Sequence, residues 1–359
     1  MWEARLFSSA ASCAFALTLM GAYHVGQRSI SFALSPELTS QLGVSSPIVH
    51  GLVWYPVNAG IARSPQLEEC GDPLFTSSCG ASAAPIAPQP MRLPLIVISH
   101  GTGGSAEQMA WLGAALARAG FVAMAISHPG NNLSSATVQG FVYWWLRPRT
   151  LSAAIDAILA DPTLGAQIDP SRIGAAGFSL GGFSVLGLAG ATVDMAQFHA
   201  ECATTPSACD APPEMAPLLP QYRAMMKNDP AFHATETTGL HSEPDPRIRA
   251  VYAIAPAIGS AVTPESLHHI AIRVRIAYGS DDIDVPPAYN AEFYARSIPG
   301  ATTLTVPGAA HYTFLDTCTP QDSEQLPNLC TDVAGVSRAT VHDQVAADAV
   351  SFFQRALLH

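Results

Sequence analysis

One serine between two glycines is the clearest chemical signal in the chain. Residues 177–181 read Gly-Phe-Ser-Leu-Gly, at the end of the strand-like run 172–179 and the start of the helix-like stretch 180–191. Glycines on both sides allow the tight strand-to-helix turn that lifts a serine hydroxyl out of the backbone. A serine hydroxyl becomes a nucleophile at neutral pH when a base takes its proton and a carboxylate holds that base. The pattern predicts Ser179 as the nucleophile of an acyl-transfer reaction.

A histidine near the end of the chain is expected to serve as the base. His311 follows the apolar run 302–308, the last strand that the sequence predicts. Serine hydrolases built on a parallel sheet carry nucleophile, acid and histidine in this chain order, with the histidine after the last strand. Other histidines stand elsewhere: His268 and His269 precede a strand, His342 opens the final helix, and His100 and His128 end strands, where they are candidates for lining a pocket.

The acid is expected just after the predicted strand 272–279. Three aspartates, Asp281, Asp282 and Asp284, lie within four positions there. Asp282 is preferred because it stands four residues before Pro286, in a G-x-x-D-x-x-x-P spacing. The other two stay open as alternatives and are otherwise interpreted as solvated loop charges.

A glycine-rich turn predicts where the negative charge of the intermediate is held. Residues 100–104 read His-Gly-Thr-Gly-Gly directly after an apolar run. A tetrahedral intermediate needs preorganised N–H donors, and glycines let backbone amides approach it. We expect the amides of Thr102 and of Leu180, the residue after the nucleophile, to be the oxyanion-hole donors. The sequence has no G-x-G-x-x-G or Walker lysine here and no cysteine–histidine spacing typical of zinc, so no cofactor and no metal are expected.

Strands and helices alternate along the chain in an order that positions these residues. Apolar runs predict strands over 48–56, 93–100, 121–129, 172–179, 247–256, 272–279 and 302–308, and helical spacing predicts helices over 107–119, 150–162, 180–191, 289–295 and 341–357. Short continuous apolar runs separated by helices indicate a mostly parallel, twisted sheet with helices on both faces, the α/β class.

One segment interrupts this alternation. Residues 192–247 contain a cysteine pair, many prolines and a Met-rich run, with few strand signals. We expect a catalytic domain over 29–359, with this segment inserted as a cap over the sheet's edge. Five apolar residues of the cap either wall an acyl pocket or, the preferred interpretation, form the cap's own core: Met215, Leu218, Leu219, Met225 and Met226. Residues 57–93, rich in Pro, Ser, Ala and Gly, predict an exposed loop.

The N-terminus has the character of a secretory leader. Arg5 precedes an apolar stretch over about residues 7–22 that carries no charge and is too short for a comfortable membrane span. We expect residues 1–25 to be a signal peptide and expect no stable membrane span after its removal. A buried or anchoring N-terminal helix is the alternative.

The cysteines point to the same compartment. The chain has seven cysteines, and the six outside the leader, all but Cys13, form neighbouring pairs along the chain: Cys70 with Cys79, Cys202 with Cys209, and Cys318 with Cys330. Six cysteines allow many connectivities, so disulfides between neighbours are preferred rather than deduced. Disulfides together with a leader indicate an oxidising compartment, and the protein is expected to be secreted or periplasmic. Reduced cysteines in a cytosolic enzyme are the alternative.

Composition excludes two classes of protein. The chain has 17 Lys and Arg against 28 Asp and Glu, a net charge of −11, and no run of basic residues that could grip a phosphate backbone. Nucleic acid is therefore not an expected partner. A hydrophobic fraction of 48% excludes intrinsic disorder over most of the length.

Taken together, the motifs resemble one branch of a known superfamily. The stretch SHGTGGSAEQMAWLGAALARAGFVAMAISHPGNN, the run RPRTLSAAIDAIL, the segment DPSRIGAAGFSLGG and GAAHYTFLD followed by Cys318 are similar to platelet-activating-factor acetylhydrolases and predicted dienelactone hydrolases of the α/β-hydrolases. The likeness covers about residues 48–357. It implies a metal-free serine ester hydrolase with Ser179, Asp282 and His311 as the triad. Phe178 replaces a histidine that many relatives have, and dienelactone hydrolases use a cysteine where this chain has Ser179.

The expected function is hydrolysis of carboxylic esters through an acyl-enzyme, with a small-molecule or lipid-like ester as substrate. A preference for short-chain or acetyl esters rests on the family likeness alone. A lactone, amide or polyester hydrolase with the same triad is the first alternative. A non-catalytic binding protein on the same fold is the second, and the sequence does not determine the oligomeric state.

Overall fold

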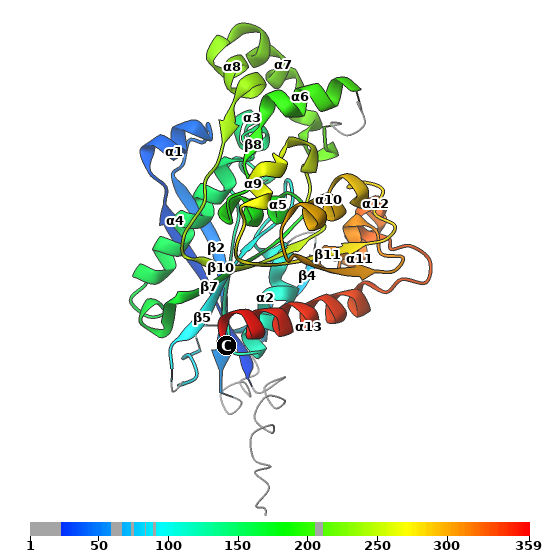
Figure 1. Ribbon diagram of the computed structural model, residues 1–359. Coiled ribbons are helices and arrows are strands. Elements are labelled where there is room, and N and C mark those ends of the chain that lie inside the picture. The colour runs from blue at the N-terminus through cyan, green and yellow to red at the C-terminus, as the bar shows by residue number, and fades with distance from the viewer. Residues whose placement is uncertain (1–22, 59–66, 73–74, 83, 89–90, 205–210) are drawn as a thin grey trace, which may run out of the picture.

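The fold is described from a computed structural model, shown in Figure 1, which places residues 23–58, 67–72, 75–82, 84–88, 91–204 and 211–359. The leader expected over residues 1–25 lies outside this description except for its last three residues, where the first strand begins. Within the described ranges, no helix is long and apolar enough to cross a membrane.

A single large sheet forms the centre of the molecule. In the part of the chain that is described it has ten strands in the order β12-β11-β10-β7-β5-β6-β2-β1-β4-β3. The strands are β1 (His24–Ala33), β2 (Ile48–Val57), β3 (Leu67–Asp72), β4 (Phe75–Ser82), β5 (Leu93–Ser99), β6 (Val122–Ile126), β7 (Ile168–Phe178), β10 (Ile248–Ile254), β11 (Arg273–Gly279) and β12 (Thr302–Val306). Six neighbouring strands of this sheet are mutually parallel: β12, β11, β10, β7, β5 and β6. Strand β2 pairs antiparallel with β6 and with β1. The mostly parallel sheet predicted from the apolar runs is confirmed.

Helices cover both faces of this sheet. The longer ones are α2 (Ala110–Arg118), α4 (Leu146–Ala160), α5 (Leu180–Leu188), α10 (Ala291–Ser297) and α13 (Arg338–Leu357). Along β5, Leu95 and Val97 pack into the cluster shared with α4, α5 and α10, while Ile96 and Ile98 pack into the cluster shared with α2 and α13. Successive side chains of a strand point to opposite faces. A continuous apolar run is therefore buried on both sides, at a gain of roughly 1.5–3 kcal/mol for each large aliphatic side chain.

The shorter helices lie in the connections. They are α1 (Pro36–Gln41), α3 (Val138–Val142), α9 (Pro264–His268), α11 (Pro320–Gln325), α12 (Pro327–Cys330) and the 3-10 turns η1 (Glu107–Met109), η2 (Gly165–Gln167), η5 (Gly259–Ala261), η6 (Pro287–Tyr289) and η7 (His311–Phe314). Two predicted helices begin earlier than expected, α4 by four residues and α13 by three. A proline in the first turn of α4, Pro148, explains the difference there, because the N–H groups of a first turn have no intrahelical acceptor and proline is tolerated.

The expectation of an exposed loop over residues 57–93 is wrong. Strands β3 and β4 pair antiparallel in this stretch, and β4 also pairs with β1, with Ala81 opposite Gly26. Strand β1 itself was not predicted. Strand β1 pairs on both sides, with β2 and β4, but polar residues interrupt its sequence, HVGQRSISFA, so the apolar pattern on which a sequence-based prediction depends is weak.

The segment that interrupts the alternation folds as a helical insertion over residues 193–241. It contains β8 (Val193–Asp194), α6 (Met195–Thr204), η4 (Pro213–Leu218), α7 (Leu219–Asn228), α8 (Pro230–Thr238) and β9 (Leu240–His241). Strands β8 and β9 pair antiparallel, so the insertion leaves and re-enters the main body side by side. Figure 1 shows α6, α7 and α8 gathered at one end of the molecule, far from the C-terminus. Met215 and Phe232 pack with α3 to form a core for the insertion.

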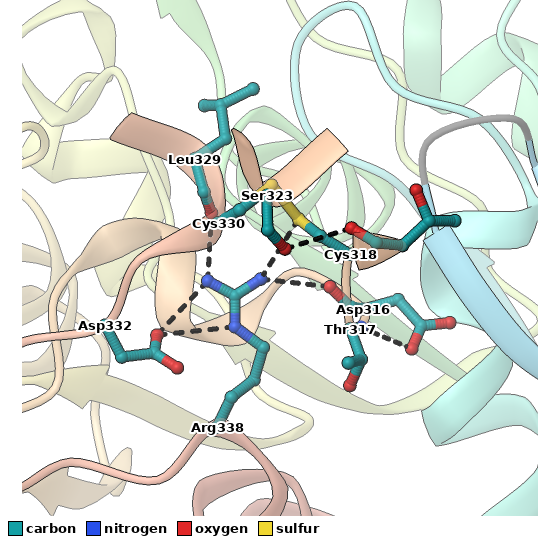
Figure 2. Close-up of a disulfide and its surroundings, with 9 residues drawn as sticks. Asp316, Thr317, Cys318, Ser323, Leu329, Cys330, Asp332 and Arg338 are labelled. Atoms are coloured by element: carbon teal, nitrogen blue, oxygen red, sulfur yellow. Dashed lines mark hydrogen bonds and ion pairs between the residues drawn. A yellow bond between two sulfur atoms is a disulfide. The ribbon is translucent and has the colours of Figure 1, made fainter. Parts of the chain in front are cut away.

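A disulfide closes the segment that follows η7. Cys318 and Cys330 are bonded, with their Cα atoms 5.7 Å apart, and Figure 2 shows Arg338, from the first turn of α13, beside them. The Arg338 guanidinium donates to the carbonyls of Asp316 (3.0 Å) and Leu329 (2.9 Å) and to the carboxylate of Asp332 (3.1 Å). The disulfide closes a loop over residues 318–330, and the Arg338 guanidinium links this part of the chain to the last helix.

The other two expected disulfides are described only in part. Cys202 is disulfide-bonded, and its expected partner, Cys209, lies outside the described residues. The side chains of Cys70 and Cys79 also lie outside the description. These two pairings stay predictions.

Candidate active site

Ser179 sits on a strained turn between β7 and α5. Its backbone has φ 56° and ψ −121°, a conformation that residues other than glycine rarely adopt. The turn is held from both sides, because the Ser179 amide donates to the Ile254 carbonyl at 2.9 Å and the Ser179 carbonyl accepts from Phe183 and Ala257 at 3.2 and 3.1 Å. The hydroxyl therefore stands at the carboxyl end of the sheet, where the sequence predicted a nucleophile.

The glycine after the nucleophile is required by a close approach of two backbones. A Cβ on Gly181 would lie 2.1 Å from the Ser99 carbonyl oxygen and 2.5 Å from that of His100. Real Cβ atoms do not come so close to backbone atoms. Gly181 therefore lets the first turn of α5 press against the end of β5, which brings the Ser179 turn beside the glycine-rich turn after β5.

The histidine and acid expected from the sequence lie next to the serine. His311, in η7 after β12, has its Nε2 atom 2.9 Å from the Ser179 Oγ atom and its Nδ1 atom 2.8 Å from Asp282 Oδ2. All three side chains are buried, with exposed fractions of 7%, 4% and 3% for Ser179, His311 and Asp282. An ionised carboxylate only accepts, so Nδ1 donates to Asp282 and Nε2 accepts the Ser179 hydroxyl proton.

The three aspartates that the sequence offered as the acid differ in burial and in hydrogen-bond partners. Asp282 is turned inward, and its second oxygen, Oδ1, accepts from the Val285 amide at 2.8 Å. Asp281 is exposed and accepts from the Ser280 hydroxyl at 2.7 Å. Asp284 is also exposed. Of the three, the structure brings Asp282 to His311.

The two residues expected to form an oxyanion hole lie at the same cavity as the serine. Thr102 and Leu180 line one cavity with Ser179 and His311. Leu180 is the first residue of α5, whose N–H has no intrahelical acceptor. No described residue accepts a hydrogen bond from either amide. Two free donors beside a buried hydroxyl can hold a developing negative charge.

The cavity has a volume of about 990 Å³ and lies between the sheet and the helical insertion. Residues of the insertion that line it include Phe198, Glu201, Glu214, Met215, Leu219, Tyr222 and Glu236. Met215 and Leu219 therefore both line the cavity and belong to the core of the insertion, whereas Leu218, Met225 and Met226 belong to that core alone. All five residues thus belong to the core of the insertion, the preferred interpretation, and two of them also line the cavity.

Burial makes part of the acidic wall neutral. Glu236, on α8, is 3% exposed, and desolvation raises its pKa to about 8. Its Oε1 atom accepts from the Tyr222 hydroxyl at 3.4 Å, while Oε2 has no partner among the described residues. Burial also raises the pKa of Glu214. At neutral pH the Glu236 carboxyl is therefore protonated.

The raised pKa of Glu236 predicts a pH-dependent stability. An unfolded glutamate titrates near 4.3. The stabilisation from this proton is therefore complete below about pH 4.3 and is lost as the pH rises through about 8. Between about pH 5 and pH 8, wild type is expected to lose on the order of 2–4 kcal/mol more unfolding free energy than Glu236→Gln, measured by urea titration. Glu265→Gln, an exposed control, should follow wild type, and an equal loss in Glu236→Gln would contradict the assignment.

Sequence reasoning missed the residues behind the glycine-rich turn. His100 and His128 were candidates for lining a pocket, but neither lines the cavity, and both are buried, with exposed fractions of 0% and 1%. They belong to a polar network with Arg147 and Asn131, which no motif had indicated. Arg147 stands beside a proline at the start of a helix, and this sequence pattern does not distinguish a buried arginine from one on the surface.

Comparisons with known proteins agree with the fold. A model of the alpha/beta hydrolase family matches residues 96–322. The chain is also 32% identical to Lipase 1 of Moraxella sp. (strain TA144) over 117 residues, which are 33% of this chain and 30% of that protein. The matched region thus spans less than a third of that relative.

A solved structure is similar over nearly the whole chain. Ferulic acid esterase from Streptomyces cinnamoneus has a TM-score of 0.61, with 93% of this chain and 90% of that chain covered, at 18% sequence identity. At this identity the likeness concerns the fold alone. The narrower branch that the sequence resembles stays a prediction.

Proposed function

The chain belongs to the alpha/beta hydrolase family, and from this premise we propose that it hydrolyses carboxylic esters through an acyl-enzyme on Ser179. One observation carries the proposal. Buried hydrogen bonds connect the Ser179 hydroxyl to His311 and His311 to Asp282, and both Ser179 and His311 line a cavity. This is the arrangement that activates a serine nucleophile.

In the proposed reaction, His311 Nε2 takes the proton of Ser179 as Oγ attacks the ester carbonyl carbon. Asp282 keeps the imidazole in the tautomer that accepts at Nε2 and stabilises the imidazolium that forms. The protonated His311 then donates its proton to the leaving alkoxide, and the alcohol departs. Water, deprotonated by His311, releases the acid and restores the serine.

The oxyanion of both tetrahedral intermediates is proposed to lie between the amides of Thr102 and Leu180. These donors are fixed before substrate arrives, so they stabilise charge without reorganisation. We propose that the strained backbone of Ser179 contributes in the same way, because its positive φ between strand and helix holds Oγ clear of α5, next to the residue that carries the second donor.

The cavity supports an ester with a sizeable apolar part. Its volume of about 990 Å³ is near the upper end of small-molecule sites. The lining includes Glu201 and Asp284 against one guanidinium, Arg296, and this balance disfavours an anionic substrate. We propose a neutral, small-molecule or lipid-like ester, and an insertion that acts as a cap whose side chains select it.

The compartment is proposed from two features. The apolar leader and the disulfide between Cys318 and Cys330 both favour an oxidising environment. We therefore propose that the mature enzyme is secreted or periplasmic.

A substrate panel tests the activity. Purified protein should hydrolyse p-nitrophenyl esters, and a series from acetate to laurate should define the acyl preference. A parallel panel of lactones, amides and polyester particles separates the proposal from the related reactions. Turnover of none of these esters, together with no reaction of Ser179 with a fluorophosphonate, would indicate a binding protein on a hydrolase fold.

A further inference from the structure

A buried arginine lies directly behind the candidate oxyanion hole. Arg147, in the first turn of α4, is 1% exposed, and no carboxylate among the described residues pairs with it. Burial lowers its pKa to about 9, so the guanidinium stays charged at neutral pH. Burying a cation without a carboxylate is costly. Such a group calls for an explanation in terms of the atoms it contacts.

One side of the guanidinium holds the glycine-rich turn. An Nη atom donates to the carbonyl of His100, and the other Nη donates to the Asn131 Oδ1 atom at 2.6 Å. The same Oδ1 atom accepts from the amide of Gly103 at 3.3 Å. The backbone on both sides of Thr102 is thus fixed through Arg147, and Thr102 carries one of the two proposed oxyanion donors.

Its remaining nitrogen holds the start of α5. Arg147 Nε donates to the Ser184 hydroxyl at 2.9 Å, and that hydroxyl donates to the Leu180 carbonyl at 2.7 Å. Leu180 carries the second proposed donor. One side chain therefore connects both halves of the hole, which belong to segments about eighty residues apart in the sequence.

The neighbouring histidines leave Arg147 as the cation of this network. His128 contacts Thr150 and Ser99 through its two ring nitrogens at 2.7 and 2.8 Å, and His100 accepts from the His128 amide. Burial and the nearby Arg147 charge lower the pKa of both rings well below the usual value. Both histidines are therefore neutral, and the positive charge beside the hole belongs to the guanidinium.

We propose that Arg147 is a positioning residue for the ester hydrolysis proposed above. It holds the Thr102 and Leu180 amides at the spacing that a single oxyanion requires, and its charge adds to the positive potential of the hole. A displaced amide stabilises the transition state much less, because its hydrogen bond must reach the position that the oxyanion will occupy.

Arg147→Met tests this role against a purely structural one. The substitution is expected to lower kcat/KM about a hundredfold, the size typical of losing one oxyanion donor, with KM changed by less than about threefold. Affinity for a trifluoromethyl ketone should fall by a similar factor, since its adduct with Ser179 carries an oxyanion. Each rate is divided by the concentration of active sites, measured as the amount of Ser179 that a fluorophosphonate labels when the reaction is complete.

Two further variants make the result specific. Arg147→Lys offers one nitrogen in place of the planar fork and cannot hold both segments at once, so its kcat/KM should lie between the values of Arg147→Met and wild type. Arg172, at the far end of β7, bonds to Asp169 and to the Arg92 carbonyl. Arg172→Met is the matched control: it removes a guanidinium remote from the site and should leave kcat/KM within about twofold.

If Arg147→Met does not fold, Asn131→Ala carries the test, because it cuts the link to the Gly103 amide and leaves Arg147 in place. It should lower kcat/KM at least about fivefold. The inference about Arg147 would be wrong if folded Arg147→Met, or failing that Asn131→Ala, kept kcat/KM and ketone affinity within about twofold of wild type. The proposed ester hydrolysis would still stand in that case. A wild-type enzyme that neither hydrolyses esters nor binds the ketone would instead overturn the proposed function.

Discussion

Replacing Ser179 with alanine is expected to lower kcat for ester hydrolysis by about five to six orders of magnitude, the scale of triad knockouts in serine hydrolases. The reason is chemical. The Ser179 Oγ atom lies 2.9 Å from His311 Nε2 and is the atom proposed to bond to the acyl carbon. The residual rate over water would come from the cavity and the oxyanion donors alone. Steady-state kinetics with the best p-nitrophenyl ester provide the measurement.

The fold of this variant should be intact, since alanine adopts the positive φ of the turn about as well as serine does. Its thermal midpoint should therefore match wild type. Ser171→Ala provides the control, because Ser171 is an exposed residue on the same strand, at the end remote from the site. More than about one per cent of wild-type activity in purified Ser179→Ala would contradict the assignment of the nucleophile.

Asp282→Asn is expected to lower kcat by about four orders of magnitude while leaving the fold unchanged. Asp282 bonds at both ends, to the Val285 amide through Oδ1 and to His311 Nδ1 through Oδ2, each at 2.8 Å. In the variant the asparagine carbonyl must serve Val285, so its NH2 group faces Nδ1. The imidazole then carries its proton on Nε2 and cannot accept the proton of Ser179.

The neighbouring aspartate gives a sharp comparison. Asp281→Asn removes the same charge one residue away, but Asp281 is exposed and contacts Ser280 rather than His311. Its kcat should stay within about twofold of wild type, since exposed charges contribute little. Equal losses in Asp281→Asn and Asp282→Asn would mean that loop charge, rather than the contact with His311, supports the activity.

Several features of the fold were predictable because they depend on local patterns. The parallel strands followed from short apolar runs such as that of β5, in which alternate residues are buried on opposite faces. The position of Ser179 followed from Gly177 and Gly181, since the close backbone approach at Gly181 excludes any other residue. The order of serine, acid and histidine needed only the placement of strands.

Other features depend on contacts that a pattern does not encode. Strands β3 and β4 consist mostly of polar and small residues, so their sequences, LEECGD and FTSSCGAS, carry no strand signal. Arg147 lies in a helix start that resembles an exposed one in sequence, and its burial arises from Asn131 and Ser184 on other elements. The spacing to Pro286 favoured Asp282, but the inward direction of its side chain is a property of the folded loop.

The most direct test of the central claim is chemical labelling of the nucleophile. Wild-type protein is treated with a fluorophosphonate, digested, and mapped by mass spectrometry, with Ser179→Ala treated in parallel. We expect a single adduct on Ser179, loss of esterase activity in proportion to labelling, and no adduct on the variant. An adduct on a different serine that tracks the loss of activity, or full activity after Ser179 is labelled, would contradict it.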